Sequence, residues 1–456
     1  MSQPTSQKIG HAIARGTAYA TIGNMALRVI DAAVAVLLLV GLSVYSYGLY
    51  TLALASYSFW TVFFLPALQN VIVSDVSATK QSNPAQAHSL FSVYSYYLCI
   101  VGVSLWALFF FGSHHFAYWL DGHGEYLIAV SWLFLLAPFE TIFGVKAAIM
   151  LDFGWVLAFR VIRSVSRLAM LVALTWFSAL SVTYAIEAAA LSLAIAIAAT
   201  FFYKRETWLS WIGWSDIKLF WKHSIRTHGK WALAEDAFNS STQSVQPFII
   251  KYFLGAEAVA LISLASNLLS YAKSALPIRD VLFPILPQTE DRAQLARYAG
   301  KLMKYATIAY VGITVAASIG APIVTHLLIP KYAPALELFY ILILSLPVFG
   351  IRSVAVPLFY TLKAQKALFF IIVSRTILGF VLLIGLIQLF GLTGAAASMT
   401  VVGIVTAISY LHEIRRQLPQ LRISMKEIIQ IDEVDMLILG QIKTYVGRKV
   451  RILFRQ

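Results

Sequence analysis

Apolar runs about as long as a membrane-spanning helix alternate with short polar connections along most of the chain. A helix that crosses the hydrocarbon core of a bilayer needs about 20 mostly apolar residues. The runs therefore predict six spans in each half of the chain. They lie at about 16–42, 48–74, 89–112, 126–150, 156–178 and 182–203, and then at about 230–254, 257–283, 300–328, 334–360, 367–389 and 392–411.

A polar break at residues 204–229 separates the two apolar arrays. It mixes basic residues with Trp208, Trp211, Trp214 and Trp221, at spacings that can share one helical face. Basic and aromatic residues together are typical of a helix lying in the membrane interface, and a solvated linker is the alternative. We predict an N-terminal six-helix lobe (1–203), a cytoplasmic interfacial hinge (204–229), a C-terminal six-helix lobe (230–412) and a basic cytoplasmic tail (413–456).

Composition supports an integral membrane protein. The 456 residues are 59% hydrophobic and 12% charged, with a mean hydropathy of +0.76, which is too apolar for a soluble core. The N-terminus shows no cleavable signal peptide, so we expect the first span to be retained. Cys99 lies alone in an apolar span, which excludes an intramolecular disulfide and a cysteine metal cluster.

Charge predicts both the orientation and the partners. Most basic residues of the connections fall on one side, which places both termini in the cytoplasm. Lys251 and Lys331 lie at the margins of the other side. The net charge of +14 is spread over membrane edges and spans, so membrane lipids, and not nucleic acid, are the expected partners.

Three short matches between the halves suggest an internal repeat. The first aligns Tyr47–Ser56 with Val259–Leu268 at an offset of about 212 residues, and two later matches follow in the same order. A six-span unit repeated in one orientation predicts two lobes related by an axis along the membrane normal, with the substrate path between them.

Four motifs resemble a known family. The Tyr-Gly-Leu-Tyr stretch of span two, VLFPILP (Val281–Pro287), the segment Ile329–Ser345 and the segment Gly391–Met399 are similar to the polysaccharide flippases of the multidrug/oligosaccharidyl-lipid/polysaccharide exporter superfamily. The resemblance covers about residues 10–412. It implies an all-α, MATE-like fold of about twelve transmembrane helices in two six-helix lobes.

The resemblance also implies a function. Such a flippase moves a polyprenyl-diphosphate-linked oligosaccharide, the repeat unit of an O-antigen or exopolysaccharide, from the inner to the outer leaflet of the cytoplasmic (inner) membrane for cell-surface polysaccharide biosynthesis. A polysaccharide polymerase and chain-length machinery are then expected partners, and no cofactor is expected. The twelve spans are fewer than those of the peptidoglycan-precursor flippases, which disfavours that branch.

Basic residues inside the spans predict the binding site. A charge at the bilayer centre costs about 2.5 to 3.5 kcal/mol, so each must be compensated or useful. Arg28 and Asp31 share a face of span one, either as a structural pair or as part of a site. We predict a cationic cavity that holds the diphosphate through charge-assisted hydrogen bonds. Its residues are Arg28, Arg163, Arg167, Lys273, Arg352 and Arg375.

Carboxylates inside the spans are candidate counter-ions or sites for a coupling proton or cation. They are Asp31, Glu140, Glu187, Glu235 and Asp236. Asn239, Gln243 and Gln246 give span seven a polar face, which suits a sugar path or interhelical hydrogen bonds.

The sequence carries no catalytic motif, phosphate-binding loop or metal-ligand pattern, so it does not predict an enzyme or a metal site. Prolines in spans two, four, eight and ten suggest kinks. A multidrug/cation antiporter of the same superfamily is the nearest alternative function, although it would favour carboxylates over arginines. A membrane polysaccharide polymerase is a third interpretation, disfavoured by the short outer loops.

Overall fold

The computed structural model describes residues 27–64, 68–69, 72–73, 75–77, 79, 83–150, 152–203, 230–276, 278, 282, 292–362, 364–419 and 421. Within these ranges every regular element is a helix. The predicted hinge, nearly all of the tail beyond residue 419, the Val281–Pro287 motif apart from Leu282, and Pro66 and Pro277 lie outside the described residues.

The N-terminal bundle begins with a helix over residues 27–41. The elements that follow are α2 (Val44–Trp60) with the 3-10 helix η1 (Thr61–Phe64), α4 (Pro84–Phe116) with η2 (Ala117–Leu120), α5 (Gly124–Ile149), α6 (Phe153–Trp176) and α7 (Val182–Tyr203).

Short polar residues fix where several of these helices begin. Ser43 caps α2, because its Oγ accepts a hydrogen bond from the Ser46 backbone N–H at 3.0 Å. Asp152 caps α6 in the same way, through the backbone N–H of Trp155 at 3.2 Å. Both side chains satisfy a donor that the first helical turn leaves unpaired.

The C-terminal bundle contains the helices after residue 229. They are α9 (Lys230–Leu254), α10 (Ala256–Lys273), α12 (Arg292–Leu328), the 3-10 helix η5 (Pro330–Tyr332), α13 (Ala335–Ile343), α14 (Leu346–Thr361) and α15 (Gln365–Gln417). Between α13 and α14 the axis bends by 52°, immediately before Pro347, so the kink predicted for span ten is confirmed.

The 53-residue α15 consists of two helices joined at Gly391, which has φ 60° and ψ −133°. Glycine tolerates this conformation because it has no Cβ. A Cβ on Gly394 would lie 1.9 Å from the carbonyl oxygen of Leu386, and one on Gly379 would lie 3.9 Å from Val402. These pairs on either side of Gly391 show that the chain reverses there, as predicted for spans 367–389 and 392–411.

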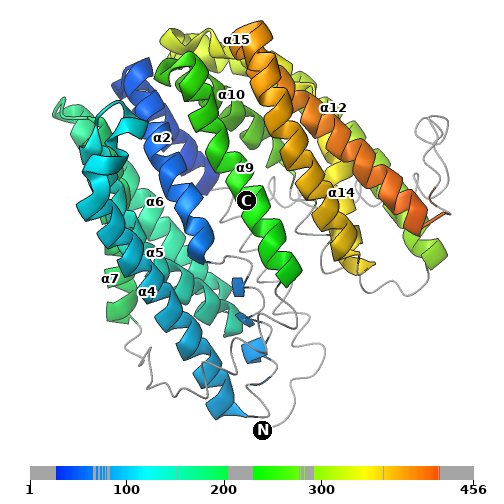
Figure 1. The fold of residues 1–456 in the computed structure, drawn as a ribbon, viewed down its shortest axis with the longest axis horizontal. Helices are drawn as coiled ribbons and strands as arrows, with labels where there is room; N and C mark the ends of the chain where they lie inside the picture. Colours follow the sequence, from blue (N-terminus) through cyan, green and yellow to red (C-terminus); the bar gives the residue numbers. More distant parts are fainter. Residues whose placement is uncertain are drawn as a thin grey trace, which may run out of the picture.

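Within the described residues, five helices are long and apolar enough to cross a membrane, or six if α13 and α14 form one span. These spans come from α4, α5, α7, α12 and α15. The shorter or more polar helices α2, α6, α9 and α10 do not meet that criterion. Figure 1 shows these four helices running alongside the longer apolar helices in the two bundles. A polar helix is stable at this depth only where it faces protein or a water-filled cavity.

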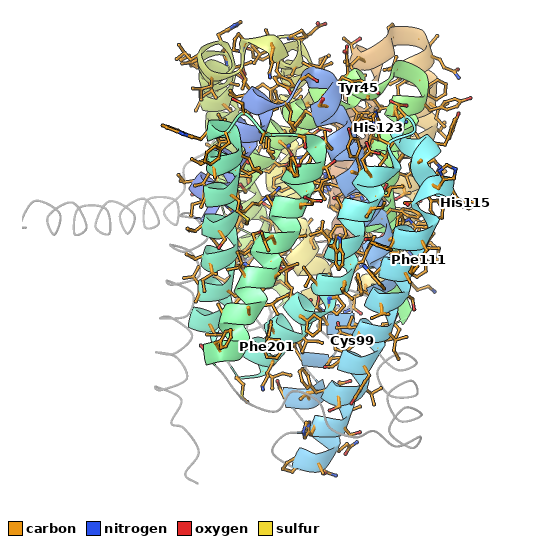
Figure 2. All side chains as sticks on the ribbon, turned by 90° about the vertical axis from the view of Figure 1, so that its left-hand side faces the viewer. Tyr45, Cys99, Phe111, His115, His123 and Phe201 are labelled. Carbon is orange, nitrogen blue, oxygen red and sulfur yellow. The ribbon has the colours of Figure 1, made fainter. Side chains whose placement is uncertain are left out.

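The two bundles converge at one edge of the molecule and spread apart toward the other (Figure 1). At the convergent edge α2 packs against α10. A Cβ on Gly48 would lie 2.0 Å from the Ala256 carbonyl oxygen, so only glycine permits this approach. Tyr45 and His123 lie at this end of the molecule and Phe201 lies at the other end (Figure 2).

Two lysines of the C-terminal bundle bridge to the N-terminal bundle at the convergent edge. Lys251, in the last turn of α9, forms an ion pair with Asp121 at 2.8 Å and donates to the Trp119 carbonyl oxygen at 2.7 Å. Asp121 also accepts a hydrogen bond from Tyr45 at 3.0 Å. We call this the bridged edge.

Lys331 makes the second bridge. Its Nζ donates to the backbone carbonyl oxygens of Val40, at 2.9 Å, and Leu42. These carbonyls lie at the end of the first helix, where the last turn leaves acceptors free. The bridged edge is therefore held by ammonium groups from two separate helical segments, α9 and η5.

Candidate functional site

A cavity of about 650 Å³ lies between the bundles. Its walls come from residues of the first helix and of α2, α6, α9, α10, α13, α14 and α15. All four helices that are too short or too polar to count as apolar spans take part. A deep basic residue from α6 (Arg167) and one from α10 (Lys273) therefore face a shared cavity, as do Gln243 and Gln246 of α9, which explains how these residues are accommodated at membrane depth.

Lys273 and Arg352 supply the positive charge of the C-terminal wall. The Lys273 Nζ and the Arg352 Cζ lie 5.5 and 5.9 Å from the centre of the same Phe349 ring. Neither forms an ion pair with a carboxylate among the described residues, and the buried Nε of Arg352 has no hydrogen-bond acceptor there. We call these two residues the cation pair.

Arg375 of α15 lies close enough to repel both members of the cation pair, but it does not line the cavity. Three basic groups in one low-dielectric region oppose one another strongly. An anion in the cavity would relieve that repulsion.

Arg167 projects from α6 of the N-terminal bundle into the same cavity. Its guanidinium donates to the Tyr50 hydroxyl, and its buried Nε has no acceptor among the described residues. The Tyr50 ring stacks on Tyr47, with centroids 6.0 Å apart, and the Tyr47 hydroxyl lies near the side chain of Asn267 of α10. Arg167 is thus positioned by an aromatic contact chain that crosses between the bundles.

Arg28 and Asp31 use separate partners. The Arg28 guanidinium donates to the backbone carbonyl of Ser274, across the bundle boundary. Asp31 lines the cavity and accepts a hydrogen bond from Ser164 at 3.4 Å. The self-neutralising pair that their spacing suggested does not form in this structure, because each side chain has found a partner on another helix.

The expectation that Arg163 lines the cationic cavity is wrong. Its guanidinium forms an ion pair with Glu140 of α5, which neutralises both groups within the N-terminal bundle. Glu140 and Arg160 instead line a second, smaller cavity of about 240 Å³ with Gln69 and Trp155.

The remaining predicted carboxylates are not part of the cavity as described. Glu187 is exposed on α7 and does not line it. Glu235, Asp236 and Asn239 lie on α9, but their side chains lie outside the described residues. In the described part of the chain no group of three or more His, Cys, Asp or Glu residues could hold a metal ion.

Sequence reasoning missed several residues of the cavity wall. Tyr47 and Tyr50, one helical turn apart, were considered only as part of the Tyr-Gly-Leu-Tyr motif and not as cavity residues. On α10, Ser263, Ser266, Asn267, Ser270 and Lys273 line the cavity at helical spacing. This polar stripe within an apolar span was a usable signal.

Comparison with known proteins identifies the family. The family model described as "Polysaccharide biosynthesis protein" matches residues 13–290, more than half of the chain. The protein therefore belongs to this polysaccharide biosynthesis family. No curated protein sequence matches significantly.

Three solved structures show the same fold. An inward-facing multidrug resistance MATE family transporter has a TM-score of 0.71 at 14% identity, covering 86% of this chain and 94% of that one. The lipid II flippase MurJ, in an inward closed conformation, has a TM-score of 0.67 at 13% identity, with coverage of 93% and 92%. A MOP superfamily transporter from Pyrococcus furiosus, whose structure is titled for the reverse polarity of its binding pocket, has a TM-score of 0.62 at 15% identity, with coverage of 90% and 96%.

These findings confirm the predicted class. The protein is a multi-pass membrane protein with a MATE-like fold, and every regular element in the described ranges is a helix. The solved neighbours named above are described as transporters or as a flippase.

Proposed function

We propose that this protein is a flippase that moves a polyprenyl-diphosphate-linked oligosaccharide from the inner to the outer leaflet of the cytoplasmic membrane for cell-surface polysaccharide biosynthesis. The observation that carries the proposal is the cation pair. Lys273 and Arg352 line one cavity without a carboxylate partner among the described residues, and Arg352 keeps an unused buried N–H. Leaving a buried donor unsatisfied costs about 1 to 3 kcal/mol, which a bound anion would recover.

A diphosphate suits this site better than a cationic drug does. Three basic side chains, Arg167, Lys273 and Arg352, line the cavity against one carboxylate, Asp31. Phosphate oxygens accept charge-assisted hydrogen bonds, and the planar guanidinium of Arg352 can donate two of them in parallel. A multidrug/cation antiporter would need more carboxylates than basic side chains in its cavity.

The bridged edge supports the direction of transport. Lys251 and Lys331 close the bundles there, while exposed basic residues gather at the ends of α12 and α15 near the spread edge. They include Arg292, Arg297, Arg415 and Arg416. By the positive-inside rule the spread edge is cytoplasmic. The cavity then receives its substrate from the inner leaflet, and rocking of the bundles would open the other side.

Binding of a polyprenyl diphosphate without sugar tests the proposal. We expect the purified protein in lipid nanodiscs to bind this probe, and Arg352→Ala to weaken binding by about 10- to 100-fold, since a hydrogen bond to a charged group contributes about 1.5 to 3 kcal/mol. Arg352→Lys should restore part of the affinity as a point charge without the fork.

Arg297→Ala is the matched control, because Arg297 is an exposed arginine of the same bundle. It should bind like the wild type. Unchanged binding in Arg352→Ala and Lys273→Ala, or tight binding of an organic cation in place of the diphosphate, would overturn the proposal.

A further inference from the structure

Arg167 lies at a different depth in the cavity from the cation pair. Its partner Tyr50 stacks on Tyr47, and Tyr47 contacts Asn267 of α10. Lys273 lies six residues further along α10. At a rise of 1.5 Å per residue, the two levels are about 9 Å apart along the helix axis.

Counting residues along α6 gives about the same depth for Arg167. Arg167 lies nine residues before the end of α6 at Trp176, which corresponds to about 14 Å. On α10, counted from Ala256 at the bridged edge, Asn267 lies about 17 Å and Lys273 about 26 Å along the axis. Arg167 therefore belongs to the level of Asn267, nearer to the bridged edge.

The walls at this level combine uncharged polar side chains with apolar ones such as Ile250 and Ile262. Gln243 and Gln246 of α9 and Ser263 and Ser266 of α10 line the cavity together with Asn267. Neither glutamine makes a hydrogen bond to another residue in the part of the chain that is described. Free amides and hydroxyls of this kind match the hydroxyl and acetamido groups of a saccharide.

Asp31 does not neutralise Arg167. Its carboxylate meets α6 at Ser164, one turn nearer to the spread edge, and no ion pair joins it to Arg167 among the described residues. The Arg167 guanidinium is half-buried, is oriented by Tyr50 and has an unused Nε–H. It is therefore an anion-binding group set among sugar-compatible neighbours.

We infer that Arg167, held by Tyr50, forms a second anion subsite that takes a carboxylate on the carried glycan, so that the substrate saccharide is acidic. This inference rests on the proposed function. A diphosphate is short compared with the roughly 9 Å between the two levels, because its two phosphorus atoms share a single bridging oxygen, so a diphosphate centred on the cation pair leaves Arg167 available to a second anionic group. The diphosphate lies at the cation pair, and the glycan extends toward the bridged edge with its carboxylate on Arg167.

Three lipid probes test the inference with protein in nanodiscs. They are a polyprenyl diphosphate, the same carrier with a neutral disaccharide, and the same carrier with one ring of that disaccharide oxidised to a uronic acid. The wild type should bind the acidic lipid at least about 10-fold more tightly than the neutral one, as expected for one charge-assisted contact. Arg167→Gln should remove this preference.

The variants separate this inference from the proposed function. Arg352→Ala should weaken all three probes by a similar factor, whereas Arg167→Gln should weaken only the acidic one. Tyr50→Phe keeps the ring but removes the hydroxyl that orients Arg167, and should reduce the preference in part. Equal affinity of the wild type for acidic and neutral lipids, or a preference that survives in Arg167→Gln, overturns the inference but leaves the proposed function standing. Failure of the wild type to bind the bare carrier overturns the proposed function itself.

Discussion

Replacing Lys251 by Met should open the bridged edge. The Lys251 ammonium makes two contacts across the bundle boundary, to the Asp121 carboxylate at 2.8 Å and to the Trp119 carbonyl at 2.7 Å. Methionine keeps the length and apolar stem of the side chain while it removes both contacts. The closed state should therefore lose stability relative to the open one.

The free energy that Lys251→Met removes from the closed state can be estimated from the solvent exposure of Lys251 and Asp121. The Lys251 side chain is 14% exposed but that of Asp121 is 38% exposed, so solvent screens the ion pair. Screened pairs contribute about 0.2 to 1 kcal/mol, and the hydrogen bond from a charged donor to Trp119 adds about 1.5 kcal/mol. A loss of about 2 kcal/mol raises the ratio of open to closed protein roughly 30-fold.

Spin-label distances can measure this ratio. Labels at His115→Cys on α4 and Glu257→Cys on α10 would sit on opposite bundles at exposed positions, in a Cys99→Ser background. The Lys251→Met protein should show a larger population at long distance. Glu125→Gln is the matched control, because Glu125 pairs with His123 at 2.8 Å within one loop of the N-terminal bundle. Identical distance distributions in Lys251→Met and the wild type would refute the bridging role.

The same bridge predicts a pH dependence. Burial would raise the pKa of the Asp121 carboxyl, but hydrogen bonds from Lys251 and Tyr45 and the charge of Lys251 outweigh burial, and its pKa lies below the usual range. A depressed pKa stabilises the closed state above the ordinary pKa, and this contribution disappears as the pH falls through the lowered one. The label distances should be constant near neutral pH and lengthen only below about pH 4.

Two further changes test other contacts between the bundles. Gly48→Ala should push the bridged edge apart, because its Cβ would lie 2.0 Å from a backbone carbonyl of α10, while Gly312→Ala, with open space around it, should not; equal label distances in these two proteins would contradict the close approach. Arg28→Ala should reduce transport by removing the bond to the Ser274 carbonyl, and adding Asp31→Asn should not restore it; recovery of transport in the double variant would instead indicate a structural pair.

The fold could be predicted from the sequence because membrane spans are defined by local composition. Apolar length alone placed a reversal near Gly391, where the structure shows a left-handed glycine. The site was harder, because the role of a buried charge depends on which helix lies beside it. Arg163 and Arg167 share a helix, yet Glu140 of α5 neutralises the first and Tyr50 of α2 orients the second.

Two lysines that do not follow the charge asymmetry of the sequence turn out to connect the two bundles. Lys251 and Lys331 were predicted at the margins of the side of the membrane opposite to most basic residues, and the composition of the chain did not explain why lysine occurs there. Their partners are a carboxylate and backbone carbonyls more than 100 positions away in the chain. Contacts of this separation leave no local periodicity, so only the structure could reveal why lysine occupies these two places.

The charge of the empty cavity makes the protein sensitive to voltage. Three basic side chains and one carboxylate line the cavity, which leaves two formal positive charges when nothing is bound. A membrane potential acts on each charge that crosses it with about 2.3 kcal/mol per 100 mV. In the proposed orientation, a negative cell interior draws the unloaded cavity back toward the cytoplasm, whereas a bound diphosphate with two negative charges cancels the charge. With the glycan carboxylate inferred above also bound at Arg167, the loaded cavity carries one net negative charge, so that the voltage assists both the return of the unloaded protein and the outward step.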